Sequence, residues 1–177
     1  MQNRERQHYD GENDKEYIIS SFQKCVTEKR EMDKYFETII SPFLNSKKLN
    51  ILDACCGIGY ISYFLSEIST ESKFLGIDQT GYLIEEAQKL CKDKSNISFE
   101  TSDIYNISKK YNKKFDISIN WRTLSWLPYY DQILKELFSV TKDHIFLSSL
   151  FYDGDIDFIT QIREFKTEAG GEHFNDY

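Results

Sequence analysis

Three aspartates, each at the end of an apolar run, carry the chemistry that this sequence offers. Asp53 leads into a glycine turn at residues 55–60, and Asp78 and Asp103 end the next two apolar runs. Because the carboxyl ends of parallel strands meet at one edge of a sheet, we expect the three acids to lie close together there. Carboxylates accept hydrogen bonds from hydroxyl and amino groups, so the spacing predicts a nucleoside ligand.

The glycine turn adds a second kind of contact to this edge. Gly57 and Gly59 lack side chains, so the backbone can bend sharply and a ligand can lie against it. The helix that follows offers N–H groups to an anion such as the carboxylate of a methionine moiety. Two carboxylates with such a turn favour S-adenosylmethionine. Three plainer interpretations stay open: an ordinary strand-to-helix turn, a helix cap at Asp78 and a solvated loop acid at Asp103.

These acids are positioned by an alternation of strands and helices. Apolar runs predict strands at 49–53, 73–78, 97–101, 115–120 and 144–150. Apolar residues at helical spacing separate them, and a weaker helix is expected over 156–165. The helix after Pro128 is expected to carry on its apolar side Tyr130, Ile133, Leu134, Leu137 and Phe138. This pattern is typical of an α/β fold with a doubly wound, mainly parallel sheet.

The chain divides into three segments. Residues 1–15 are polar and are expected to form a flexible arm, and residues 16–44 form an N-terminal helical cover that stops near Pro42. Residues 45–177 form the ligand-binding α/β domain. Two apolar stripes mark the cover, namely Ile18, Phe22, Cys25 and Val26, and then Met32, Tyr35, Phe36, Ile39, Ile40 and Phe43. Since little chain follows the fifth strand, we expect the C-terminal strands to be missing and the domain to be truncated.

The motifs, in this order and spacing, resemble those of a class I, Rossmann-like S-adenosylmethionine-dependent methyltransferase of the small-molecule type. The family's first motif aligns with residues 53–59, with Cys55 at its first glycine. The resemblance implies that Asp78 binds the ribose and that Asp103 and Ile104 bind the adenine. It also implies that the fourth strand, which ends at Asn120, leads into a loop beside the methyl group.

The site expected from the motifs and the resemblance therefore has two parts. Cofactor contacts are predicted for Asp53, Cys55, Gly57, Gly59, Asp78, Gln79, Ser102, Asp103, Ile104 and Asn120. Acceptor contacts are predicted for Trp121, Arg122 and Trp126, with core packing of either tryptophan and a surface role for the arginine left open. The sequence indicates no catalytic base and no metal site.

The composition narrows the kinds of acceptor and partner to be expected. The net charge of −7 and the pI near 5.0 disfavour nucleic acid. The fourth strand also lacks the Asn/Asp-Pro-Pro-aromatic signature of amino-directed nucleic-acid methyltransferases. We therefore expect a small-molecule acceptor. The polar start and the lack of an apolar run of ~20 residues predict neither a signal peptide nor a membrane span. Four cysteines without a C-x-x-C pair suit a reduced, cytoplasmic setting.

Two other functions share parts of this pattern. An NAD(P)-dependent oxidoreductase also has a glycine turn and a distal acid. Against it, Ser62 replaces the third glycine, and Asp53 would repel a pyrophosphate. The second alternative is a non-catalytic module of the same fold that binds S-adenosylmethionine or a partner. The acidic run at 153–157 has the spacing of a calcium loop, but Phe158 stands where the loop needs glycine, so a plain loop is expected.

Overall fold

A parallel sheet of five strands is the centre of the computed structural model, which describes residues 12–44, 48–127, 129–149, 161–165 and 172–176. The strands are β1 (Asn50–Ala54), β2 (Lys73–Asp78), β3 (Ile97–Thr101), β4 (Phe115–Asn120) and β5 (Thr141–Leu147). Their order is β3-β2-β1-β4-β5, and all neighbouring pairs are parallel. The order reverses between β1 and β4, and ligands of open α/β sheets bind at such a reversal.

The sheet confirms the predicted fold class and most predicted strands. β2, β3 and β4 have the predicted bounds, and β1 is shifted by one residue at each end. The fifth strand was placed too late, because it begins at Thr141 and ends at Leu147. Thr141 pairs with Phe115 of β4, so backbone pairing draws in the exposed polar residues Lys142 and Asp143 that the sequence pattern had excluded.

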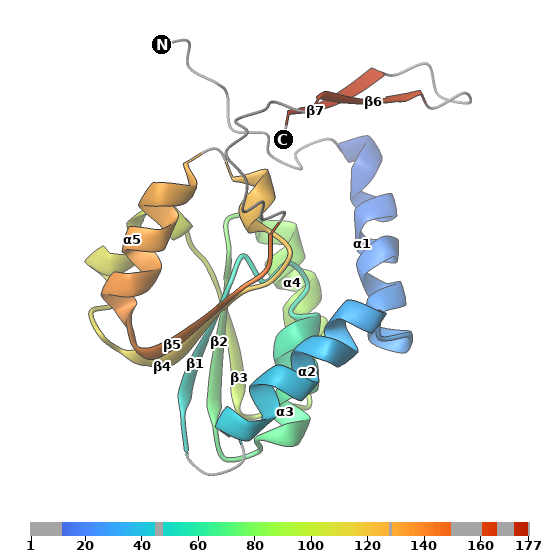
Figure 1. Ribbon diagram of the computed structural model, residues 1–177. Helices are drawn as coiled ribbons and strands as arrows, with labels where there is room; N and C mark the ends of the chain where they lie inside the picture. Colours follow the sequence, from blue (N-terminus) through green and yellow to red (C-terminus); the bar gives the residue numbers. More distant parts are fainter. Residues whose placement is uncertain (1–11, 45–47, 128, 150–160, 166–171, 177) are drawn as a thin grey trace.

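Helices cover both faces of the sheet (Figure 1). They are α1 (Glu12–Thr27), α2 (Glu31–Leu44), α3 (Tyr60–Ile68), α4 (Gly81–Leu90) and α5 (Tyr130–Val140), with short 3-10 helices η1 (Ile104–Lys109) and η2 (Leu124–Trp126). In Figure 1, α1 to α4 lie on one side of the strands and α5 lies on the other. This two-sided cover is the doubly wound arrangement that the sequence predicts.

Each face of the sheet has its own apolar core. On one face, Ile51 and Ile119 pack with Phe36 and Ile40 of α2 and Leu65 of α3. On the other, the buried residues come from β1, β2, β4, η1 and α5 and include Leu52, Ile77, Ile107, Ile133 and Leu137. Side chains alternate across a strand, so residues next to each other in β1 enter different cores. The central strands are thereby buried from both sides and fix the edge where the aspartates lie.

The N-terminal cover exists, but two of its expected details are wrong. α1 begins at Glu12, before the expected start at residue 16, while residues 1–11 lie outside the described residues. α2 does stop near Pro42, which lies inside the helix shortly before its end at the buried Leu44. A proline removes one helical hydrogen bond, and the burial of Leu44 against the sheet offsets that loss. The stripe expected for α2 is also partly exposed, notably at Met32, Tyr35, Ile39 and Phe43.

The buried stripe of α2 is Asp33, Phe36, Ile40 and Leu44 instead. It is rotated from the expected one because the sheet contacts only one narrow side of the helix. The same applies to α5, where Ile133 and Leu137 are fully buried but Tyr130 and Phe138 are more than 60% exposed. Apolar identity alone therefore overestimated the width of both buried faces.

The expectation of missing C-terminal strands is also wrong. β6 (Gln161–Phe165) and β7 (Glu172–Asp176) form an antiparallel pair, and the structure records them as a separate two-stranded sheet. Residues 161–165 were expected to end a helix, but pairing with β7 makes them a strand. The remainder of that expected helix and the acidic run at 153–157 lie outside the described residues.

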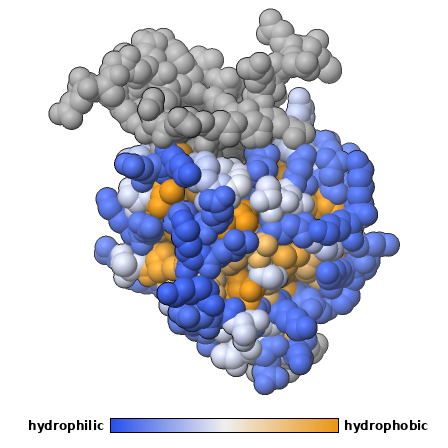
Figure 2. All heavy atoms as spheres, turned by 180° about the vertical axis from the view of Figure 1, so that it is seen from behind, coloured by the Kyte–Doolittle hydropathy of each residue, from blue (hydrophilic) through white to orange (hydrophobic). Residues whose placement is uncertain are grey.

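The face seen from behind is mixed in polarity. Figure 2 shows hydrophilic side chains surrounding smaller apolar patches on it. In the described part of the chain, no helix is long and apolar enough to cross a membrane.

Candidate functional site

The turn after β1 has an unusual backbone. Cys55, Gly57 and Gly59 have φ angles of 60°, 56° and 73°, in the left-handed region that glycine adopts freely. Cys55 pays a steric penalty there that the two glycines avoid. Three left-handed residues within five positions curl the chain back before α3 begins, so the turn presents backbone instead of side chains to the sheet edge.

The two glycines are also needed for space. A Cβ atom at Gly59 would overlap the ring of Phe99 from β3, and one at Gly57 would lie 3.3 Å from the ring of Phe22 in α1. Phe22 therefore packs over the turn. The first helix of the cover thus touches the predicted cofactor loop directly, a contact that the sequence did not suggest.

Asp78 closes the glycine turn from the neighbouring strand. Its Oδ2 accepts the backbone N–H of Gly57 at 3.0 Å, and its Oδ1 accepts the backbone N–H of Thr80 at 2.9 Å. Burial raises the pKa of this carboxyl, and the hydrogen bonds from Thr80 and Gly57 oppose the rise. The bond from Thr80 closes a turn just before α4 and does not cap that helix, whose N-cap is Thr80, so the carboxylate of Asp78 serves the two turns at this edge.

Asp53 lies beneath the turn and is 2% exposed. The hydroxyl of Ser62 in α3 donates to its Oδ2 at 2.7 Å. Burial raises the pKa of Asp53 to about 6, the Ser62 hydrogen bonds lower it, and the charge of Asp78 raises it further. Ser62, which stands where a dinucleotide fold has glycine, thus fixes the acid that begins the motif.

The third acid, Asp103, caps η1. Its Oδ1 accepts the backbone N–H of Tyr105 at 3.0 Å, and its Oδ2 accepts the amide of Asn106 at 3.1 Å. Ile104 follows it and is 5% exposed. Both residues stand at the end of β3, two strands away from β1 and on the same edge of the sheet.

Adjacent parallel strands bring the three acids to one edge of the sheet, since β1, β2 and β3 are neighbours that run in the same direction. Cys55 opens the turn at this edge. Burial raises the pKa of its thiol well above the usual value, followed in effect by the charges of Asp78, Asp53 and Asp103, while a hydrogen bond with Asn120 opposes the rise. A pKa shift in this direction makes a thiol less reactive as a nucleophile.

Asn120 completes this edge from β4. Its Nδ2 donates to the backbone carbonyl of Ala54 at 3.0 Å. Its Oδ1 is buried and has no hydrogen-bond partner in the described part of the chain. Buried polar atoms are rarely left unpaired, so this oxygen is a place for a donor group of a ligand.

The structure gives fewer contacts for the other predicted site residues. Gln79 and Arg122 are exposed, and Ser102 is half-buried with its backbone N–H donated to the carbonyl of Asp78 at 2.9 Å. Arg122 has a φ of 61°, which turns the chain sharply after Trp121. Trp126 belongs to η2, and its side chain lies outside what the structure describes.

Trp121 joins the sheet edge to the helical cover. Its ring stacks on Phe36 with the centroids 4.0 Å apart, and its Nε1 donates to Oδ1 of Asp33 at 2.9 Å. Asp33 is 3% exposed and was missed at the level of sequence. A signal was present, because Asp33 precedes Phe36 and Ile40 at helical spacing and so continues their buried stripe.

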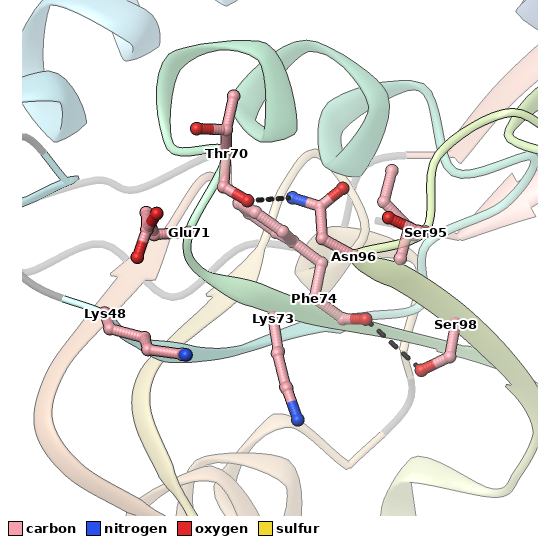
Figure 3. Close-up of a pocket in the computed structure, with 9 residues that line it drawn as sticks. Lys48, Thr70, Glu71, Lys73, Phe74, Ser95, Asn96 and Ser98 are labelled. Carbon is pink, nitrogen blue, oxygen red and sulfur yellow. Dashed lines mark hydrogen bonds between the residues drawn. The ribbon is translucent and has the colours of Figure 1, made fainter.

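A hollow of about 430 Å³ lies elsewhere, at the amino ends of β2 and β3 (Figure 3). Figure 3 shows Lys48 and Lys73 at its border, and Asn96 donates to the carbonyl of Thr70 at 3.4 Å. It occupies the edge opposite the aspartates, so it is separate from the predicted site. In the described ranges, no group of three or more His, Cys, Asp or Glu side chains is placed to hold a metal ion.

Comparison with known proteins identifies the family. A family model described as a methyltransferase domain matches residues 45–170, so the chain belongs to that family. The predicted class, a Rossmann-like S-adenosylmethionine-dependent methyltransferase, is confirmed, and with it the cofactor of the family. The match favours this class over an NAD(P)-dependent oxidoreductase.

Individual relatives of this chain are also named as methyltransferases. Malonyl-[acyl-carrier protein] O-methyltransferase of Bacillus cereus is 28% identical over 110 residues, covering 62% of this chain and 40% of the relative. The enzyme of that name from Bacillus anthracis is 25% identical over 134 residues, covering 75% of this chain and 49% of the relative. The chain thus spans less than half the length of these curated relatives.

Solved structures share the fold. The plantazolicin methyltransferase BamL, in complex with a triazolic desmethylPZN analog and SAH, has a TM-score of 0.59 and 25% identity, covering 73% of this chain and 48% of that one. A SAM-dependent methyltransferase from Aquifex aeolicus has a TM-score of 0.54 and 21% identity, covering 60% of this chain and 57% of that one. The second likeness shows the fold alone.

Proposed function

We propose that this chain binds S-adenosylmethionine at the carboxyl edge of β1 to β4 and transfers its methyl group to a small-molecule acceptor. One observation carries the proposal: Asp53, Asp78 and Asp103 stand at or just after the carboxyl ends of three adjacent parallel strands, beside a left-handed glycine turn. The nearby Oδ1 of Asn120 is buried and unpaired in the described part of the chain. Such a set suits a ligand rich in hydroxyl and amino donors.

Each group has a proposed task. The turn at Gly57 and Gly59 presents backbone N–H groups to the carboxylate of the methionine moiety. Asp78 accepts hydrogen bonds from the ribose hydroxyls while it holds the turn. Asp103 accepts from the adenine amino group, and the buried Ile104 packs against the ring. Gln79 and Ser102 flank these acids and are assigned supporting contacts.

In the proposed methyl transfer, the main task of the protein is to align the two reactants. A bound sulfonium supplies the reactivity for in-line displacement of the methyl group. The chain's part is to hold donor and acceptor in line and to exclude water, which brings a large share of the rate enhancement. Trp121 lies beside the end of β4 and is proposed to wall the acceptor side together with Arg122 and Trp126.

The acceptor is proposed to be a small molecule because the net charge of −7 disfavours nucleic acid. The relatives do not narrow it further. The names given above refer to a malonyl group on an acyl carrier protein in one case and to a plantazolicin analog in another. The second candidate is a non-catalytic module that binds S-adenosylmethionine. It stays open because the chain spans only 40% and 49% of the two malonyl-[acyl-carrier protein] O-methyltransferases described above.

Calorimetric titration with S-adenosylmethionine, S-adenosylhomocysteine and NADH tests the cofactor. We expect micromolar binding of both adenosyl ligands, weakened at least about tenfold, or ~1.4 kcal/mol, by Asp78→Ala. Binding of NADH alone would contradict the proposal. Transfer of radiolabelled methyl groups to a panel of small acceptors then separates an enzyme from a module, since a module binds the cofactor without turnover.

A further inference from the structure

Six of the eight large hydrophobic side chains that are exposed in the described part of the chain lie on two helices. The helices are α2 and α5, and the six side chains are Met32, Tyr35, Ile39, Phe43, Tyr130 and Phe138. Because α2 and α5 lie on opposite sides of the strands (Figure 1), the two exposed stripes form one surface only if both point to the same edge of the sheet. A group of such side chains on one surface marks a contact with another molecule.

The exposed stripe of α2 lies on the flank of that helix that faces β5. Phe43 contacts His144 and Phe146 of β5, with the ring centroids 4.6 Å and 5.4 Å apart. The other stripe residues of α2 precede Phe43 at steps of three and four positions, so they share its flank. On the opposite flank, Glu37 forms an ion pair with Lys29 in the turn that follows α1. The stripe therefore points away from α1 and toward the β5 edge of the sheet.

The exposed stripe of α5 points to the same edge. One flank of α5 faces η1, because Gln132 donates to the carbonyl of Tyr105 at 3.2 Å and Glu136 accepts from the backbone N–H of Ser108 at 2.7 Å. With 3.6 residues per turn, the stripe residues lie roughly 120–160° around the helix from these two side chains. η1 follows β3, which is at the far end of the strand order from β5. The stripe of α5 thus faces the β5 edge.

Between the two stripes runs the outer edge of β5. In the described part of the chain β5 pairs with β4 alone, and β6 and β7 pair with each other in a separate sheet. The outward N–H and C=O groups of β5 are therefore open to another strand. Lys142, the one lysine of β5, pairs with Asp116 of β4 at 2.8 Å, so its charge does not guard this edge. We call the two stripes and this strand edge together the β5 surface.

We propose that the β5 surface is the interface of a homodimer, in which the β5 strands of two copies pair edge to edge. A twofold axis at right angles to the sheet makes the two strands antiparallel. The same axis brings the α2 stripe of one copy against the α2 stripe of the other, and likewise for α5. The strand edge and both stripes are thus satisfied by one partner of identical surface.

The size of the β5 surface suits a stable dimer. Its six stripe side chains are 38–67% exposed, so each presents about half of a surface of ~200 Å². Together they present on the order of 600 Å² per copy, and two copies bury on the order of 1,200 Å² from the stripes alone, the area at which specific interfaces begin. Hydrogen bonds between the paired strands add to this contact.

Sedimentation velocity of the full chain from about 1 to 200 µM tests the proposal. We expect a dimer with a dissociation constant of ~10 µM or below. Tyr35→Lys and Phe138→Lys each place a charge in the interface, so each should weaken the dimer at least about tenfold. Both side chains are more than 60% exposed, so the charge is solvated in the monomer. Tyr17→Lys, at a site 66% exposed on α1, is the matched control and should leave the dimer unchanged.

A native chain that stays monomeric at about 200 µM overturns the proposal, and so does a dimer that neither Tyr35→Lys nor Phe138→Lys weakens. An equal loss in Tyr17→Lys also overturns it, because it shows a general charge effect. Hydrogen exchange adds a readout on the native chain that needs no variant. Amide exchange in β5 should slow at least about tenfold on dimerisation, while β3, at the other edge of the sheet, should not change. Unchanged exchange in β5 would place the interface elsewhere.

Discussion

The carboxylate of Asp78 accepts the backbone N–H of Gly57 at 3.0 Å, which makes the end of β2 and the turn after β1 one hydrogen-bonded unit. The bond explains why the turn keeps its shape next to a carboxylate, since one left-handed residue of the turn is held by that acid. A change at Asp78 should therefore act on the turn and on the proposed ribose contact together.

Asp78→Asn tests both effects. An asparagine oxygen can still accept from Gly57, but the amide then sets a donor against the N–H of Thr80 and loses the charge. We expect S-adenosylhomocysteine affinity to fall at least about tenfold and the free energy of unfolding to fall by about 1–3 kcal/mol. Calorimetric titration and urea unfolding measure the two. Asp116→Asn, at the opposite edge of the sheet, is the control; unchanged affinity in Asp78→Asn would remove this acid from the cofactor site.

Gly59→Ala should destabilise the fold. Gly59 has a φ of 73°, and the added Cβ would overlap the ring of Phe99. We expect a loss of roughly 2 kcal/mol or more in the free energy of unfolding, from backbone strain and overpacking together. Gly81→Ala adds the same methyl group where no atom lies within 4 Å, so it should be close to neutral. Equal stability of the two variants in urea unfolding would argue against this geometry of the turn.

The buried Asp53 predicts a specific pH dependence. Its pKa in the folded chain is about 6, above the value near 3.9 expected when unfolded, so the folded state binds more protons between those values. The contribution of Asp53 to stability is therefore fully present below about pH 4 and is lost as the pH rises to about 6. Asp53→Asn keeps an acceptor for Ser62 and removes this titration.

The measurement for Asp53 is the difference in unfolding free energy between the native chain and Asp53→Asn at several pH values. We expect Asp53→Asn to gain on the order of 2 kcal/mol relative to the native chain between pH 4 and pH 6, with no further change above that. A difference that stays flat over this range would show that Asp53 titrates as an ordinary carboxyl.

Trp121→Phe tests the link between the sheet edge and the helical cover. It removes the indole N–H and leaves both oxygens of the buried Asp33 without a donor, so we expect a loss of about 1–3 kcal/mol in unfolding free energy. Combining it with Asp33→Leu replaces both polar partners, and the double variant should be more stable than Trp121→Phe alone. If the double variant is less stable by the sum of the single losses, the two side chains do not interact.

The main sheet could be read from the sequence because its strands are short apolar runs bounded by acids and glycines. The bounds of β2, β3 and β4 were predicted correctly for this reason, since burial on both faces leaves little ambiguity. β5 was misplaced because its first residues are polar and are held by pairing with β4. β6 was missed because it forms a strand by pairing with β7. A local pattern of apolar residues does not show that pairing.

The candidate site also contains residues that the sequence indicated and one residue that it did not. Asp53, Asp78 and Asp103 could be proposed as site residues because each stands at or near the end of a strand, and the sheet topology brings these strand ends to one edge. Asp33 was missed because an acid in the first turn of a helix is ordinarily a solvated group that favours the helix dipole. Its burial depends on Trp121, far away in sequence, and the width of the buried face of α2 is set by the sheet. The helical spacing of Asp33 with Phe36 and Ile40 was a signal in the sequence, but it does not show that Trp121 is the partner.

The contact of Phe22 with the glycine turn has a consequence for the order of events during synthesis. α1 packs through Ile18 and Phe22 on Ile58, Gly57 and Leu83, all of which the ribosome adds later. Until Leu83 has left the exit tunnel, the apolar stripe of α1 has no surface to cover and stays open to solvent or chaperones. α1 is therefore buried well after it is made, although β4, α5 and β5 follow later still.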